Sequence, residues 1–146
     1  NKKFLKNMKI KSAEMEGHLA NDAYLKILFL EPMLLIEKYN FTYMDDKIYY
    51  ENIVNPDKKN CIIKYFNKEE KYGLFLDDKD KNSKLFDYRE KLFIVDNFTK
   101  PIKGISNYKS QQLKDICKKL KIDIMKTPTK SKTKKELYQL VIEKLL

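Results

Sequence analysis

Apolar and polar positions follow a regular pattern in the last quarter of the chain, over residues 110–146. Two groups of four apolar residues recur there with the period of one α-helix face. They are Leu113, Ile116, Cys117 and Leu120, and then Leu137, Leu140, Val141 and Leu145. The pattern predicts two short amphipathic helices that pack their apolar faces against each other.

Capping residues and a proline mark the ends of these two predicted helices. Ser110 stands at the N-cap position of the first helix, and Thr133 with Glu136 has the spacing of a capping box before the second. Between them, Pro128 interrupts the helical pattern, because proline lacks a backbone N–H and restricts the residue before it. The sequence therefore predicts a helix, a basic loop over residues 122–132 and a second helix.

Ammonium groups, hydroxyl groups and the free N–H groups of a helix start converge around this loop. Groups of these kinds bind phosphate. The residues predicted to bind nucleic acid are Lys126, Thr129, Lys130, Ser131, Lys132, Thr133, Lys134 and Lys135. A second group near the end of the first helix comprises Lys118, Lys119 and Lys121. The alternative interpretation is a solvated helical hairpin whose lysines only maintain solubility.

The arrangement of helix, loop and helix resembles the SAP domain and its relatives with a helix–extended loop–helix structure. The matching residues are Leu113, Lys114, Ile116, Leu120 and Ile122 in the first half, and Lys134, Glu136, Leu137, Val141 and Leu145 in the second. The resemblance covers roughly a quarter of the chain. SAP-like modules usually bind DNA, so the resemblance implies a DNA duplex that faces the loop and the start of the second helix.

The net charge of +10 belongs mostly to one end of the chain. From Lys100 onward there are 13 lysines and four acidic residues, a balance of +9, whereas the first 99 residues carry a balance of +1. Such asymmetry is typical of an electrostatic footprint for a polyanion. Arg89 is the only arginine. Because lysine is a point charge without the fork of arginine, the composition favours phosphate contacts over base recognition.

Before residue 100, the pattern predicts helices followed by strands. Residues 12–39 are expected to be mainly helical, with Glu31-Pro32 as the boundary between two helices. The predicted strands are 41–44, 47–54, 61–66, 71–76, 85–86 and 92–95, with the first four forming two hairpins. The expected fold class is α+β, with N-terminal helices, a mostly antiparallel meandering sheet and a small C-terminal helix–loop–helix module.

The composition divides the chain into three parts. Residues 1–99 are expected to form an α+β scaffold or protein-interaction domain, residues 100–107 a linker, and residues 108–146 the SAP-like nucleic-acid-binding module. The sheet segments are rich in tyrosine and phenylalanine, which can stack on unpaired bases. Their surroundings are nearly neutral, so ordinary packing is the favoured interpretation.

The sequence contains no pattern typical of an active site, a metal site or a cofactor site. His18 is the only histidine, and Cys61 and Cys117 lack metal-ligand spacing. The two cysteines are therefore predicted to be buried apolar residues, which is typical of an intracellular protein. The apolar run over residues 23–36 is interrupted by Lys26, Glu31 and Pro32, which argues against a membrane span.

Residues 17–25, GHLANDAYL, followed by an apolar run and paired strands, resemble the later half of an ovarian-tumour-type cysteine protease domain of giant-virus proteins. That family uses an upstream cysteine and a late histidine, and this sequence has neither at the corresponding places. The resemblance implies an inactive remnant or a piece of a longer protease-like chain.

The sequence as a whole favours a non-enzymatic protein that binds nucleic acid, DNA more than RNA, through phosphate contacts. The first 99 residues are expected to contact a protein partner, and no membrane partner is expected. The alternative is a structural or interaction subunit of a viral or other large assembly, whose basic end binds an acidic protein surface. The expected localisation is intracellular: the nucleus, or a viral factory or virion if the protein is viral.

Overall fold

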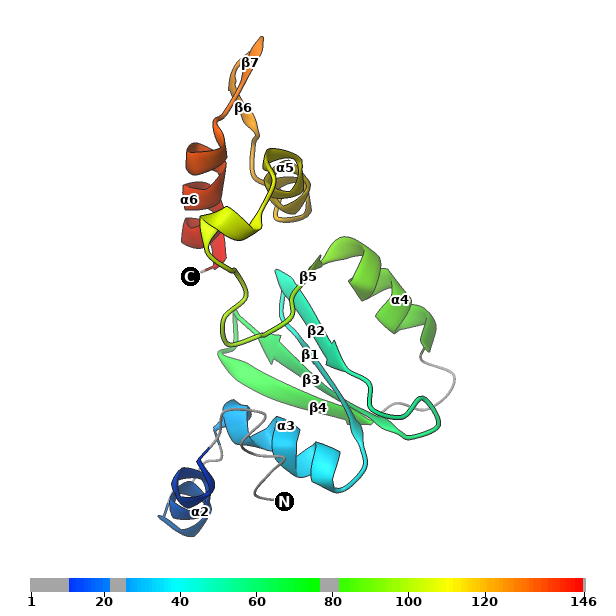
Figure 1. Ribbon diagram of the computed structural model, residues 1–146. Helices are drawn as coiled ribbons and strands as arrows, with labels where there is room; N and C mark the ends of the chain where they lie inside the picture. The colour runs from blue at the N-terminus through cyan, green and yellow to red at the C-terminus, as the bar shows by residue number, and fades with distance from the viewer. Residues whose placement is uncertain (1–10, 22–25, 77–81, 146) are drawn as a thin grey trace.

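The computed structural model describes residues 11–21, 26–76 and 82–145. It contains helices and a five-stranded mixed sheet, so the predicted α+β class is confirmed (Figure 1). The elements in chain order are α2 (Ser12–Asn21), α3 (Ile27–Ile36), β1 (Asn40–Met44), β2 (Ile48–Asn52), β3 (Asn60–Phe66), β4 (Lys71–Leu76), α4 (Asn82–Lys91), β5 (Phe93–Ile94), the 3-10 helix η2 (Ile105–Asn107), α5 (Ser110–Lys119), β6 (Met125–Thr127), β7 (Lys130–Ser131) and α6 (Lys134–Leu145).

The sheet has the strand order β4-β3-β1-β2-β5. The two predicted hairpins are confirmed, because β1 pairs antiparallel with β2 and β3 pairs antiparallel with β4. The predicted meander is wrong, however, since β3 lies beside β1 and runs parallel to it. The second parallel pair is β2 with β5. The sheet is thus two hairpins joined side by side, with a crossing connection between β2 and β3.

Asn40 holds this crossing connection in place. Its buried side-chain amide donates to the carbonyl oxygens of Asn55 (2.7 Å) and Lys58 (3.1 Å), and its Oδ1 accepts from the N–H groups of Val54 (2.9 Å) and Asn55 (3.0 Å). One side chain at the start of β1 therefore satisfies four backbone groups of the segment that carries the chain to the far side of β1. These contacts explain why β3 lies beside β1 and not beside β2, as it would in a meander.

Helix α3 covers one face of the sheet, and helix α4 covers the other (Figure 1). The predicted break at Glu31-Pro32 is wrong, because Pro32 lies inside α3. The proline removes one intrahelical hydrogen bond, and the packing of Leu30 and Leu34 on the sheet offsets that loss. The buried Glu31 carboxylate accepts hydrogen bonds from Tyr50 Oη (2.6 Å) and from the side chain of Asn52.

Helix α4 replaces the strand predicted at Leu85-Phe86. Leu85, Tyr88 and Leu92 are spaced as on one helix face, and all three pack against the buried cluster of Met44, Tyr49 and Ile62. Phe86 points away and is largely exposed. The strand prediction rests on the adjacent apolar pair Leu85-Phe86. The spacing of Leu85, Tyr88 and Leu92, in contrast, is that of one helix face. The strand predicted over residues 92–95 is confirmed as β5.

The C-terminal segment, residues 108–145, packs against the end of the sheet near β5 (Figure 1). Phe93 of β5 and Leu145 of α6 each contact both the sheet core and the core between α5 and α6. Tyr138 Oη of α6 also donates a hydrogen bond to the carbonyl oxygen of Lys103 (2.9 Å). These contacts orient α5 and α6 relative to the sheet.

Lys38 ends α3 in the left-handed region, with φ of 63°. The N–H of Tyr39 donates to Leu34 O (2.9 Å) and that of Lys38 to Leu35 O (3.1 Å), which is the hydrogen-bond pattern of a Schellman motif. Glycine adopts this conformation without the steric cost of a Cβ atom. We expect Lys38→Gly to raise the free energy of unfolding in urea by about 0.5–1 kcal/mol, and Lys38→Ala to leave it nearly unchanged. Equal effects of the two substitutions would contradict this explanation.

Candidate nucleic-acid interface

The apolar faces of α5 and α6 form a buried seam. Leu113 and Cys117 of α5 and Leu137 and Val141 of α6 are fully buried and lie in one cluster. The predicted facing stripes are therefore confirmed. Leu140 departs from the pattern, because it is only half-buried and lines a surface groove instead. The seam fixes where α5 ends and α6 begins, and so where the segment between them lies.

Both ends of α5 are capped by local hydrogen bonds. Lys109 is the N-cap, one residue before the predicted Ser110, and its N–H donates to Gln112 Oε1 (2.6 Å). At the other end, Ile122 N–H donates to Cys117 O (2.8 Å), and Lys121 has a φ of 56°. This second Schellman motif turns the chain sharply out of the helix.

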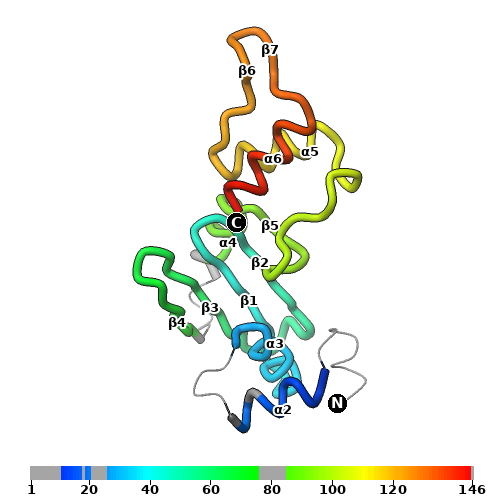
Figure 2. The backbone as a smooth tube through the Cα atoms, turned by 90° about the vertical axis from the view of Figure 1, so that its left-hand side faces the viewer, coloured from blue at the N-terminus to red at the C-terminus, as the bar shows by residue number. Residues whose placement is uncertain are grey.

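The predicted loop forms a short β-hairpin. Met125 of β6 pairs with Ser131 of β7, Thr127 pairs with Lys130, and the turn contains Pro128 and Thr129. Thr127 Oγ1 accepts a hydrogen bond from Lys130 N–H (3.1 Å), which closes the turn. The hairpin projects from the rest of the molecule beyond α5 and α6 (Figures 1 and 2). A two-stranded, lysine-bearing ribbon is thereby presented to solvent.

Lys132 braces the base of the hairpin. Its side chain is only 22% exposed, and Nζ donates hydrogen bonds to the carbonyl oxygens of Asp123 (2.8 Å) and Met125. Its N–H also donates to Ile124 O (2.8 Å). Lys132 was predicted as a phosphate ligand from its position in the sequence. The structure gives its ammonium group an internal role in holding the two strands together.

Thr133 and Glu136 form the predicted capping box at the start of α6. Glu136 Oε2 accepts from Thr133 N–H (2.7 Å) and Thr133 Oγ1 (2.8 Å), and Glu136 N–H donates to Thr133 Oγ1 (3.3 Å). The other carboxylate oxygen, Oε1, accepts from Lys126 Nζ of the hairpin (2.6 Å). These bonds, led by the one from Lys126, lower the pKa of Glu136 from 4.5 to about 2. A carboxylate thus occupies the anion site at this helix start.

The remaining predicted residues of the first group face solvent to different degrees. Thr129, Lys130 and Lys135 are exposed, whereas Ser131 and Lys134 are half-buried. Among the residues that the structure describes, no carboxylate lies within ion-pair distance of Lys130, Lys134 or Lys135. These three ammonium groups, on the hairpin and the first turn of α6, are available to an external anion.

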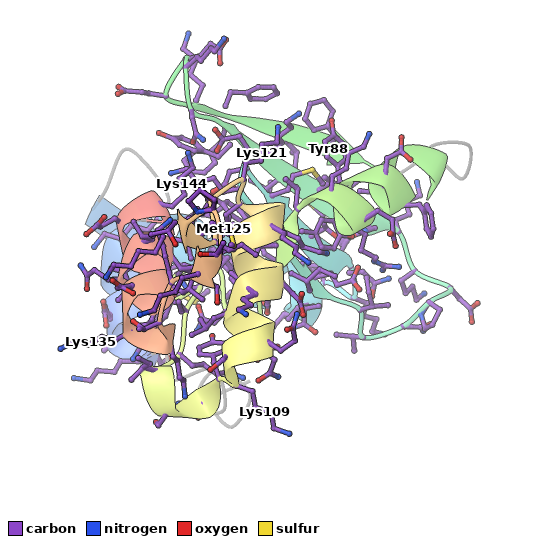
Figure 3. The ribbon with its side chains drawn as sticks, turned by 90° about the horizontal axis from the view of Figure 1, so that it is seen from above. Tyr88, Lys109, Lys121, Met125, Lys135 and Lys144 are labelled. Carbon is purple, nitrogen blue, oxygen red and sulfur yellow. The ribbon has the colours of Figure 1, made fainter. Side chains whose placement is uncertain are left out.

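The second group of lysines lies elsewhere. Seen from above in Figure 3, Lys109 and Lys135 lie toward one end of the paired helices, whereas Lys121 and Lys144 lie toward the other. Lys119 Nζ donates to Leu92 O (3.2 Å), so its side chain is directed to the sheet region, and Lys118 is exposed. The structure therefore does not gather Lys118, Lys119 and Lys121 with the lysines at the start of α6.

A surface groove of about 550 Å³ runs beside the first half of α6. It is lined by Lys132, Thr133, Lys135, Glu136, Gln139 and Leu140. The sequence did not point to Gln139 and Leu140 as part of the site, since Leu140 was assigned to the buried stripe. It also did not predict the pairing of Lys126 with Glu136, because ten residues separate them and only the fold of the hairpin brings them together.

A second pocket, of about 450 Å³, lies outside this interface, between β5 and the start of α5, and its lining includes Asp96, Lys100 and Gln112. Within residues 11–21, 26–76 and 82–145, no group of three or more metal-ligating side chains comes together, and no helix is long and apolar enough to cross a membrane. The side chain of His18 and residues 22–25 of the protease-like segment lie outside the described residues. Family models, curated proteins and solved structures gave no match to this chain.

The low pKa of Glu136 predicts a pH-dependent contribution to stability. A carboxylate whose pKa is lower in the folded state than in the unfolded chain stabilises the fold above pH 4.5, and that contribution disappears as the pH falls toward about 2. We therefore expect Glu136→Gln to lower the urea midpoint by a constant amount at pH values above about 4.5, and by progressively less as the pH falls from 4.5 toward about 2. Glu143→Gln, on the same helix, provides the matched control, because the Glu143 carboxylate accepts a hydrogen bond from Gln139 (3.1 Å) and lies far from the start of the helix. A constant difference between wild type and Glu136→Gln across this range would contradict the explanation.

Proposed function

We propose that this chain is a non-enzymatic protein that binds nucleic acid, a DNA duplex in preference to RNA, through phosphate contacts. The observation that carries this proposal is the β6–β7 hairpin, which projects from the rest of the molecule (Figure 2). The hairpin bears lysines, and further lysines follow on the first turn of α6. Lys130, Lys134 and Lys135 are the expected phosphate ligands, and Thr129 is a hydroxyl donor beside them. Residues 108–146 act as the binding module, and residues 1–99 provide a scaffold that contacts protein.

The shape of the hairpin supports a duplex as the ligand. The major groove of B-form DNA is about 12 Å wide and admits a two-stranded β-ribbon, whereas the major groove of an RNA helix is too narrow for side chains to read. The turn of this hairpin is tight, and it carries small and hydroxyl-bearing residues, Pro128 and Thr129. A ribbon of this kind can approach a groove while the lysines beside it contact the flanking phosphates.

The electrostatics favour general rather than base-specific binding. Region 100–146 carries a balance of +9 and no arginine, so bidentate recognition of guanine is not supported by side chains there. Glu136 neutralises Lys126 at the edge of the same surface. Affinity should therefore depend strongly on salt and weakly on sequence.

We test this proposal by removing the three available ammonium groups from the full chain. The triple substitution of Lys130, Lys134 and Lys135 to Gln should weaken binding of a random duplex in fluorescence anisotropy. Each lost phosphate contact reduces the slope of log affinity against log salt by about 0.9, so the slope should fall by about 2.7. A triple substitution of Lys58, Lys59 and Lys68 to Gln removes the same charge from exposed positions of the sheet region. It should leave the slope nearly unchanged, and equal losses in both variants would contradict the proposed site.

Glu136 provides a second test of the same surface. Glu136→Gln removes a negative charge beside the proposed phosphate ligands and releases Lys126, so it should tighten duplex binding and steepen the salt dependence by about one further contact. Glu143→Gln changes the net charge equally near the other end of α6, where the carboxylate accepts from Gln139 (3.1 Å). We expect a clearly smaller gain there, and the same gain in both variants would show that only net charge matters.

The competing function is a contact between the basic end and an acidic protein surface. The same lysines would serve it, so salt dependence alone does not separate the two functions. An acidic protein partner that binds this end should be displaced by a duplex if the nucleic-acid proposal is right. A chain that fails to bind any duplex at low salt would instead support the protein partner.

A further inference from the structure

Strand β4 forms one edge of the sheet. It lies at the outside of the order β4-β3-β1-β2-β5, and Figure 2 shows the β3–β4 hairpin at the margin of the molecule. The opposite edge strand, β5, has only two residues, whereas β4 has six. Proline and bulges, two devices that protect sheet edges, are missing from β4, since its register with β3 is continuous. The edge is therefore long enough to pair with another strand.

Apolar side chains are exposed on both faces of this edge. Tyr72 is 55% exposed and Leu74 is 64% exposed on one face, and Phe75 is 44% exposed on the other. Tyr72 lies opposite Tyr65, with ring centroids 4.8 Å apart, at the end of the face that α3 covers only in part. Three large apolar residues on one edge strand predict a partner that covers both faces and the backbone.

Gly73 leaves room for two aromatic rings on one face of this edge. A Cβ atom at Gly73 would lie 2.8 Å from Phe66 Cε2 and 3.0 Å from Phe75 Cε2, so the two rings occupy the space above the glycine. A larger residue at this position would displace one of the rings. Within the described sheet β4 pairs with β3 alone, so the N–H and C=O groups on its other side can pair with a second strand.

We propose that β4 pairs antiparallel with β4 of a second copy of this chain, so that the two five-stranded sheets become continuous. The strand is complementary to itself about a two-fold axis at Gly73. In that register, Tyr72 of each copy lies opposite Leu74 of the other, and Lys71 lies opposite Phe75. Both aromatic–aliphatic pairs lie on one face, and the aliphatic stem of each lysine covers a phenylalanine ring on the other face.

The charge distribution is compatible with this self-association. The first 99 residues have a balance of only +1, and within Lys71–Leu76 the register about Gly73 places no like charges opposite each other. The strongly basic hairpin β6–β7 lies away from β4 (Figure 2). Two copies can therefore approach through their sheets without bringing their basic segments into direct contact.

The oligomeric state of the full chain tests this inference independently of any nucleic acid. We expect sedimentation equilibrium to show a reversible dimer with a dissociation constant on the order of micromolar, typical of a modest strand-pairing interface. Leu74→Glu should make the protein monomeric, because two carboxylates would face the partner strand at the interface. Val54→Glu, at a residue that is 65% exposed in the β2–β3 connection, introduces the same charge and should leave the dimer intact.

Cysteine cross-linking tests the register and does not depend on the charge variants. A mixture of Tyr72→Cys chains and Leu74→Cys chains should form a disulfide-linked dimer in oxidised glutathione, because these positions oppose each other across the axis. Either variant alone should cross-link far less. A wild-type chain that stays monomeric up to about 200 µM would overturn the proposal, since a micromolar dimer would be almost fully formed there. Loss of the dimer in Val54→Glu, or equal cross-linking in all samples, would overturn it as well.

Discussion

The buried seam between α5 and α6 is the constraint on which the candidate interface depends. Leu113, Cys117, Leu137 and Val141 exclude water completely, and burial of a large apolar side chain contributes about 1.5–3 kcal/mol to stability. Because the seam fixes both helices, it also fixes the two ends of the β6–β7 hairpin. Leu145, at the end of α6, contacts the sheet core and so orients the hairpin relative to the whole molecule.

Polar residues at the site stabilise the fold and also determine which charges remain available at the surface. Lys132 uses its ammonium group to bind the two carbonyl oxygens at the hairpin base, and Glu136 uses its carboxylate to cap α6 and hold Lys126. Among the predicted ligands on the hairpin and at the start of α6, Lys126 and Lys132 are thus engaged inside the molecule. Lys130, Lys134 and Lys135 remain available to an anion there.

The elements that depend on the local spacing of apolar residues could be predicted from the sequence. The features that depend on contacts between residues far apart in the chain could not. The α5–α6 seam and both sheet hairpins follow directly from apolar spacing. The adjacency of β1 and β3 depends on Asn40, whose four hydrogen bonds reach 14–18 residues along the chain. Helix α4 was missed because Leu85-Phe86 resembles a strand until Tyr88 and Leu92 are counted on the same face. At the site, the separation of Lys121 from Lys135 depends on how α5 and α6 are oriented relative to each other. The sequences of the two helices do not specify this orientation.

A backbone amide NMR titration of the full chain with a short random DNA duplex is the most direct test of the proposed interface. We expect chemical-shift changes to concentrate in residues 126–131 and around the start of α6, from Thr133 to Glu136. Residues of the buried seam and of β4 should change little. Changes centred on Lys118, Lys119 and Lys121, or on the sheet, would contradict the proposed interface, as would the absence of any change at low salt.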